Sequence, residues 1–177
     1  MKRSLVLLVM LGAVALAVPA GAAIPIKDAK LGVYVRYSDA NVRIDKIERV
    51  AHVDGAPLAS EADVGDGTTG YLIFTLSVQN PTSAEIFMPG FNIVEFLDDQ
   101  SKIDSDTAGP FVLSGKRPAP DRLAPKESVK VRVVQFGIPA DRTLTKFIFD
   151  PNNGTPQLRF QPTAANITTL PEVPRPS

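Results

Sequence analysis

The chain has 177 residues, and its 19 basic and 19 acidic side chains give a formal net charge of zero. That balance gives no electrostatic reason to expect nucleic-acid binding. There is no cysteine, which excludes disulfides, thiol chemistry and a lipid anchor on cysteine, and with one histidine it also argues against zinc or copper sites.

The N-terminus has the pattern of an export signal. Lys2 and Arg3 form a basic start, an apolar run follows over Leu5–Val18, and small residues suited to cleavage come next. Cleavage after Ala22 or Ala23 would leave about 154 residues, enough for one domain, and the loss of two basic residues makes its charge −2. The alternative is an uncleaved membrane anchor, because the apolar stretch approaches spanning length. We therefore expect a bacterial protein that is periplasmic or secreted, without a stable membrane anchor after cleavage.

Two strands are expected before residue 54, over Leu31–Tyr37 and Asn41–Val53. In the second, apolar residues alternate at Val42 and Ile44 and then change phase at Ile47. Such a change indicates a β-bulge or one helical turn, and the branched residues favour the bulge.

Residues 54–70 form a polar, glycine-rich stretch that contains a literal GxGxxG over Gly65–Gly70. A dinucleotide site needs a strand before this motif and a helix after it, so that the helix N-terminus faces the phosphates. Here a strand follows instead. We therefore expect a loop and no cofactor.

Tyr71–Pro81 is the clearest core strand of the chain. Every second residue in it is large and apolar: Leu72, Phe74, Leu76 and Val78. Period-two alternation of this kind is typical of a strand with one buried face. Asn80 and Pro81 end the strand, since proline has no N–H for the sheet.

Val129–Ile138 is the second strong strand, with its odd-numbered valines inward and Lys130 and Arg132 outward. Leu144–Phe149 is the third. Shorter strand patterns lie at Phe91–Leu97, Lys102–Asp104, Phe111–Leu113 and Leu158–Phe160, and a short apolar piece lies at Glu85–Met88. About seven to nine short strands separated by turns predict an antiparallel β-sandwich of the immunoglobulin-like class. The expected organisation is a signal over residues 1–23, the sandwich over 24–162, and a disordered proline-rich tail over 163–177.

Five segments together resemble a family of exported bacterial immunoglobulin-like domains of unknown function. They are the strand that ends in Asn80-Pro81, the hairpin Phe96–Lys102, the turn Leu123–Ser128, and the strands Val129–Pro139 and Leu144–Pro151. The resemblance covers residues 71–151 and implies the fold and export, with no catalytic residues to carry over. Ser101 and Lys126 stand where the family has glycine, so we expect different turn types there.

Four aspartates form the candidate metal site: Asp98, Asp99, Asp104 and Asp106. Loop carboxylates suit calcium, which takes six to eight oxygen ligands. The spacing does not match an EF-hand loop, and Lys102 inside the cluster would repel a cation. Aspartate is also common in turns, so a solvated hairpin is the favoured interpretation and calcium the alternative.

Catalytic patterns are weak. His52 is the single histidine, and the sequence contains neither GxSxG nor SxxK. Near the middle of the chain, Phe87, Met88, Pro89 and Phe91 form an apolar group that is expected in the core rather than at a binding surface. The predicted function is a non-catalytic interaction module whose loops or sheet edge contact another envelope or extracellular protein, without nucleic acid. The alternatives are a calcium-dependent module using the Asp98–Asp106 region and, third, a small hydrolase.

Overall fold

The computed structural model describes residues 23–50, 69–103, 107–113, 117–139 and 142–170. Most of the predicted signal therefore lies outside the described residues, as do His52 and most of the glycine-rich motif. The described parts contain β-strands and one 3-10 turn, η2 (Ala164–Asn166), and no α-helix. None of the described residues forms a helix that is long and apolar enough to cross a membrane.

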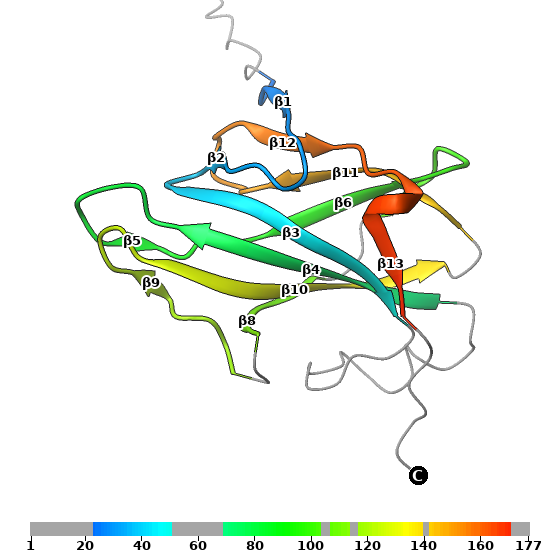
Figure 1. The fold of residues 1–177 in the computed structure, drawn as a ribbon. Coiled ribbons are helices and arrows are strands. Elements are labelled where there is room, and N and C mark those ends of the chain that lie inside the picture. The colour runs from blue at the N-terminus through cyan, green and yellow to red at the C-terminus, as the bar shows by residue number, and fades with distance from the viewer. Residues whose placement is uncertain (1–22, 51–68, 104–106, 114–116, 140–141, 171–177) are drawn as a thin grey trace, which may run out of the picture.

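Two sheets pack face to face (Figure 1). The five-stranded sheet has the order β1 (Ile26–Asp28), β12 (Gln157–Phe160), β11 (Leu144–Asp150), β6 (Asn92–Leu97) and β7 (Lys102–Ile103). The six-stranded sheet has the order β13 (Ile167–Thr169), β3 (Ala40–Val50), β4 (Thr69–Gln79), β10 (Ser128–Pro139) and β8 (Thr107–Val112), and β2 (Val35–Tyr37) also pairs with β3. A short ribbon joins β5 (Ile86–Phe87) to β9 (Arg122–Leu123).

The strand order confirms the predicted sandwich. In the six-stranded sheet, β3, β4, β10 and β8 follow the order A, B, E and D of an immunoglobulin domain. In the other sheet, β12, β11, β6 and β7 follow the order G, F, C and C′. Two short edge strands are parallel to their neighbours, β1 to β12 and β13 to β3.

The core lies between the sheets and is rich in aromatic rings. The predicted inward face of β4 is confirmed, since Leu72, Phe74, Leu76 and Val78 are all at most 1% exposed. The Phe74 ring lies 5.0 Å from that of Phe147 and 5.7 Å from that of Phe149, both on β11. Antibody domains place a disulfide between these two strands. Here aromatic contacts, worth about 0.5–1.5 kcal/mol each beyond burial, join them instead.

The change of phase in β3 is a β-bulge, as the sequence indicated. The register with β4 shifts between Ile44 and Lys46, which makes Asp45 the extra residue. A bulge restores the alternation on its far side. Ile44 and Ile47 therefore both reach the core, at 2% and 1% exposure.

Asn80 fixes the end of β4. Its side chain is fully buried, and Nδ2 donates to the carbonyl oxygens of Ala84, Leu123 and Ala124 at 2.7, 3.1 and 2.9 Å. Its Oδ1 accepts from the backbone and hydroxyl of Thr82. A residue that marks a strand end in the sequence thus holds two loops together.

The structure corrects the predicted N-terminal boundary of the first strand. Leu31–Tyr37 was expected to be one strand, but only Val35–Tyr37 is, because the chain turns at Leu31 and Gly32, where φ is +73°. The preceding entry segment instead contains β1.

The disordered tail predicted from Thr163 is wrong as far as Leu170. Residues 167–169 form β13, and the Leu170 amide donates to the Arg49 carbonyl at 2.9 Å. Proline enrichment suggested disorder, but the prolines flank this strand rather than interrupt it. Residues 171–177 lie outside the described part.

The apolar group around Phe87 divides between core and surface. Phe91 is buried and Met88 is half-buried against the core, as expected. Phe87 is 67% exposed, contrary to the expectation, and the Arg122 guanidinium lies 4.2 Å from its ring centroid. Ile86 and Phe87 are successive residues of β5 and point to opposite faces, so Phe87 faces outward where Ile86 packs against the core.

Candidate functional site

The first candidate surface is the outer face of the five-stranded sheet. On β6 the residues Ile93 and Leu97 face the core, and on β11 Phe147 and Phe149 do the same. Alternation therefore turns their neighbours to the outside. The outward set includes three apolar side chains, none of them buried: Val94, Phe96 and Ile148.

The strand register sets these residues in rows. Lys146 on β11 pairs with Phe96 on β6, and Phe96 pairs in turn with Lys102 on β7. The Lys146 Nζ lies 3.8 Å from the centroid of the Phe96 ring, a cation–π contact. We call Val94, Phe96, Lys102, Lys146 and Ile148 the Lys146 face.

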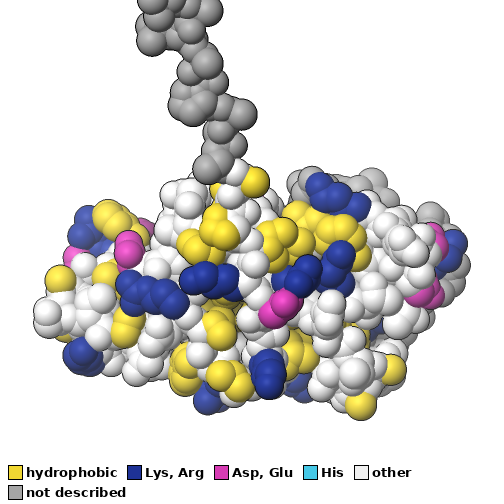
Figure 2. Space-filling model, turned by 90° about the horizontal axis from the view of Figure 1, so that it is seen from above, with side chains coloured by type: hydrophobic (Ala, Val, Ile, Leu, Met, Phe, Trp, Pro, Cys, Tyr) yellow, Lys and Arg dark blue, Asp and Glu magenta, His cyan; other side chains and the backbone are white. Residues whose placement is uncertain are grey.

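A second row continues this surface toward the edge of the sheet. Ile148 pairs with Val94 on one side and with Arg159 of β12 on the other. At the edge, β1 adds Ile26, which is 47% exposed. Figure 2 looks onto this side of the molecule and shows dark blue basic side chains among yellow apolar ones, with fewer magenta carboxylates.

The carboxylates near the Lys146 face already have partners. Asp28 accepts two hydrogen bonds from Arg159, at 2.6 and 2.9 Å. This hydrogen bonding, together with the charge of Arg159, lowers the pKa of Asp28 and outweighs the opposing effect of desolvation. Asp150 accepts from the Gln157 amide at 2.6 Å. Lys146 forms no ion pair with any described residue, so its charge is available to a partner.

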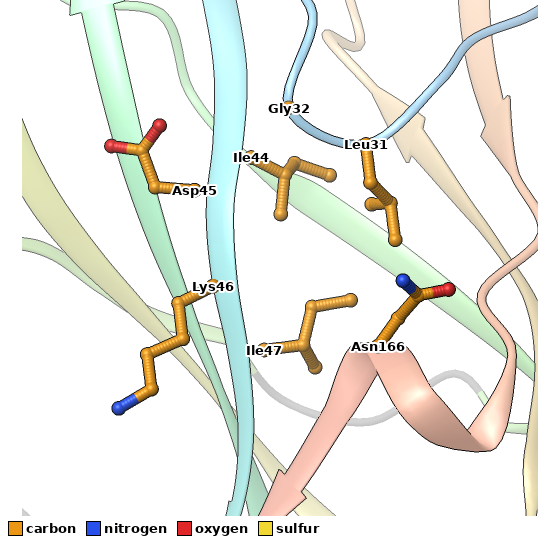
Figure 3. A pocket seen from close by; sticks show the side chains of 7 residues that line it. All are labelled: Leu31, Gly32, Ile44, Asp45, Lys46, Ile47 and Asn166. Carbon is orange, nitrogen blue, oxygen red and sulfur yellow. The ribbon is translucent and has the colours of Figure 1, made fainter.

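The second candidate is a groove on the side of the sandwich where β1 and β13 are the edge strands, made of two adjoining cavities. One has a volume of about 250 Å³ and is lined by Leu31, Gly32, Asn166 and the β3 residues 44–47. In Figure 3 the side chains of Ile44, Ile47 and Leu31 point into it, while those of Asp45 and Lys46 point away. Because Ile44 and Ile47 are only 2% and 1% exposed, their side chains close the floor of this cavity as part of the core.

The other cavity has a volume of about 330 Å³. Its lining residues are Asp28, Ala29, Lys30, Leu31, Arg159, Gln161 and Asn166. Leu31 and Asn166 line both cavities, so the two are neighbours.

The structure describes only two of the four predicted calcium ligands. Asp98 and Asp99 lie 3.8 and 3.4 Å from the Arg142 guanidinium. Asp99 also accepts from the Ser101 hydroxyl and amide; these hydrogen bonds lower its pKa, and the Arg142 charge adds to them. Asp104 and Asp106 lie outside the described residues, within which no group of three or more metal-binding side chains occurs. The calcium site stays a prediction, and Arg142 is a competing cation at its described half.

The Lys146 face was not among the sites predicted from the sequence. The available signal was the presence of large apolar residues at the outward positions of two predicted strands, 94, 96 and 148. Sequence alone does not give the register that brings Phe96 beside Lys146.

Comparison with known proteins supports the fold. No protein-family model matches the chain, and no curated protein matches it. Among solved structures, it is similar to an uncharacterized beta-sandwich protein from Clostridium difficile, with a TM-score of 0.53 and 16% sequence identity. The match covers 76% of this chain and 94% of the other. At this identity the likeness shows the β-sandwich fold alone.

Proposed function

We propose that the protein is an exported, non-catalytic module that binds another protein through the Lys146 face. The observation that carries the proposal is the partly exposed apolar row Val94, Phe96 and Ile148 on a sheet surface. Antiparallel sheets normally present polar residues on their solvated side. Large apolar side chains at these positions are typical of a contact surface.

The charges beside this row indicate the nature of the partner. Lys146 lies over Phe96 and forms no ion pair with any described residue, whereas Arg159, across from Ile148, is paired with Asp28. Aromatic residues surrounded by polar groups form the energetic centre of many interfaces. Because the nearby carboxylates Asp28 and Asp150 are already hydrogen-bonded, an acidic partner surface would complement this face.

Export rests on the N-terminal sequence. A basic start, an apolar run and small residues at the expected cleavage site are the three parts of a signal. Cell fractionation and N-terminal sequencing of the protein from its own host test this directly. A mature chain beginning near Ala23 outside the cytoplasm agrees with export, and a cytoplasmic chain that keeps Met1 contradicts it.

Capture of partners tests the binding role. The tagged mature protein is crosslinked in cells, and the proteins that co-purify are identified by mass spectrometry. The test variant combines Phe96→Ala with Lys146→Gln. The control combines Thr75→Ala with Lys130→Gln, which likewise truncates one side chain and removes one lysine charge on the outer face of the other sheet.

We expect a reproducible acidic protein partner with the unmodified chain and with the control variant, and its loss with the test variant. Circular dichroism of both variants verifies that they fold. Equal capture by the two variants would contradict a role for the Lys146 face, and no captured protein at all would contradict the interaction module.

A further inference from the structure

β1 forms one edge of the five-stranded sheet, and β12 is its neighbour there (Figure 1). The two strands are parallel. At one end of the pair the Gln157 amide donates to the Pro25 carbonyl at 3.0 Å, and at the other end the Ala29 amide donates to the Arg159 carbonyl at 2.9 Å. Pro25, Lys27 and Ala29, the odd-numbered residues of this segment, therefore turn their backbone groups toward β12.

The even-numbered residues of β1 turn their backbone groups the other way, to the free edge of the sheet. Ile26 and Asp28 thus present two N–H and two C=O groups there, and none of these groups bonds to any described residue. All three residues of β1 are exposed. A row of unpaired backbone groups at an exposed sheet edge is a template for a strand from another chain.

The edge carries positive charge. Lys27 lies on β1 itself, and Lys30 follows two residues after the strand ends; both are exposed. Neither lysine forms an ion pair with any described residue, whereas the one carboxylate on β1, that of Asp28, is held by Arg159 in two hydrogen bonds. The local charge therefore favours an acidic segment as the added strand.

A second copy of the same chain fits this edge poorly. An antiparallel pair related by a twofold axis uses all the free groups when Ile26 of one copy lies opposite Asp28 of the other. That register sets Lys27 opposite Lys27, and like charges directly opposite each other on neighbouring strands are destabilising. Lysine on an edge strand is a common means by which proteins block such self-pairing.

The edge also adjoins the Lys146 face. β12 alone separates β1 from β11, which carries Lys146 and Ile148. Neighbouring strands lie about 4.8 Å apart, so β1 is about 10 Å from β11. Ile26, which is 47% exposed, is on the same outer side of the sheet. One partner therefore reaches both surfaces at once.

We propose that the acidic partner binds β1 with an extended segment, which adds to the five-stranded sheet as a further strand; this inference rests on the proposed function. The backbone of the segment would pair with Ile26 and Asp28. Its side chains would alternate, with an apolar one beside Ile26 on the outer face and an acidic one beside Lys27 on the opposite face. In this mode of recognition, main-chain hydrogen bonds give affinity and alternate side chains give specificity.

Titration with a short acidic peptide tests the strand pairing without the cellular partner. The probe is a hexapeptide of alternating glutamate and valine, acetylated and amidated, and the whole mature protein is followed by ¹H–¹⁵N NMR. We expect shifts over residues 24–28 with a Kd on the order of 1 mM. At about 10 mM peptide, hydrogen exchange at the Ile26 and Asp28 amides should slow about tenfold. Exchange at Lys27 should change less, because its amide already faces β12.

A peptide with lysine in place of each glutamate is the matched control for charge. It should bind at least about tenfold more weakly, because its charges repel those of Lys27 and Lys30. Equal binding of the two peptides, or unchanged exchange at Ile26 and Asp28 up to about 10 mM acidic peptide, would overturn the proposal.

Two substitutions of Ile26 separate backbone pairing from side-chain contact. Ile26→Pro removes an N–H that makes no bond to any described residue, at an edge position where proline is tolerated. Ile26→Ala keeps this N–H and removes most of the side chain. We expect peptide affinity to fall about tenfold in Ile26→Pro and about twofold in Ile26→Ala, with both melting curves close to that of the unmodified chain. An equal loss in both variants would contradict strand addition.

The capture experiment in cells distinguishes this inference from the proposed function. Loss of the captured protein in Ile26→Pro, as in the Phe96→Ala, Lys146→Gln variant, supports strand addition. Loss in the second variant alone contradicts strand addition and leaves the Lys146 face as the binding surface. Capture that the Phe96→Ala, Lys146→Gln variant does not reduce contradicts the proposed function, and the peptide titration still decides whether the edge accepts an acidic strand.

Discussion

The two outer faces of the sandwich differ in how much of their outward apolar side chains is exposed to solvent. On the six-stranded sheet, the half-buried Leu170 packs against a cluster of outward apolar residues that are at most 7% exposed. The members of this cluster are Tyr71, Ile73, Phe111, Val134 and Phe136. On the Lys146 face, the outward apolar residues stay partly exposed.

The charges differ in the same way. On the six-stranded sheet, Asp45 accepts from Arg43 at 2.5 Å and from the Ser77 hydroxyl at 2.6 Å, and Lys130 lies 3.8 Å away. On the other sheet, Lys146 contacts an aromatic ring and no described carboxylate. On the six-stranded sheet, the outward apolar and charged side chains contact one another. On the five-stranded sheet, Phe96 and Lys146 stay available for a partner.

Paired phenylalanine truncations give the sharpest test of this difference. Phe136→Ala removes a ring that is 7% exposed and in edge contact with Tyr71, so it should lower the free energy of unfolding by about 3 kcal/mol. Phe96→Ala removes a partly exposed ring and should cost less than about 1 kcal/mol. Urea denaturation of both variants measures this, and equal losses would break the contrast between the faces.

Leu170→Ser tests the cover over the apolar cluster. Because Leu170 is half-buried, the loss of its contacts should lower the free energy of unfolding by about 1 kcal/mol. Binding of a hydrophobic dye should rise as Phe136 and its neighbours become exposed. An unchanged melting curve and unchanged dye binding would show that the end of the described chain does not cover this face.

Asp45→Asn tests the charged contacts on the outer face of the six-stranded sheet, through the pH dependence of stability. Desolvation raises the pKa of Asp45, but hydrogen bonds from Ser77 and Arg43, with the charges of Arg43 and Lys130, outweigh it and leave the pKa lowered. A lowered folded pKa stabilises the protein above the ordinary value of about 4 and loses that contribution as pH falls through the folded value.

In urea unfolding between pH 6 and pH 3, the Asn variant should therefore show a flatter loss of stability than the unmodified chain. The difference at pH 6 should be about 1 kcal/mol or less, as is usual for ion pairs near the surface. Parallel curves for the two proteins would contradict this account of Asp45.

Lys146→Met should have the smallest effect on folding. Methionine keeps most of the aliphatic stem over Phe96 and removes the charge, so the cost is about 0.5 kcal/mol from the lost cation–π contact. The same change should weaken the proposed acidic partner clearly. A large loss of stability would mean that Lys146 serves the fold instead.

The strands that could be predicted from the sequence are those with a long alternating pattern of apolar and polar residues. β4 and β10 are long, alternate strictly and have one apolar face, so their existence and orientation could be predicted. β1 and β13 have three residues each and are exposed or nearly so, which leaves no pattern to detect. They exist because a neighbouring strand presents unpaired backbone groups to them.

The candidate surfaces were harder to predict for a related reason. The contact between Lys146 and Phe96 needs the pairing of β6 with β11, and the register shifts between Leu144 and Lys146. The groove needs two connections to cross the same side of the sandwich. Both depend on distant parts of the chain meeting, which local patterns do not record.

The parallel edge strand β1 also limits when the domain can fold. Its Asp28 meets its partner Arg159 only 131 positions later in the chain. Non-local pairings of this kind form slowly, because the entropy of loop closure is lost before the contact stabilises the chain. A chain emerging from its N-terminus must therefore be nearly complete before its first strand has anything to pair with.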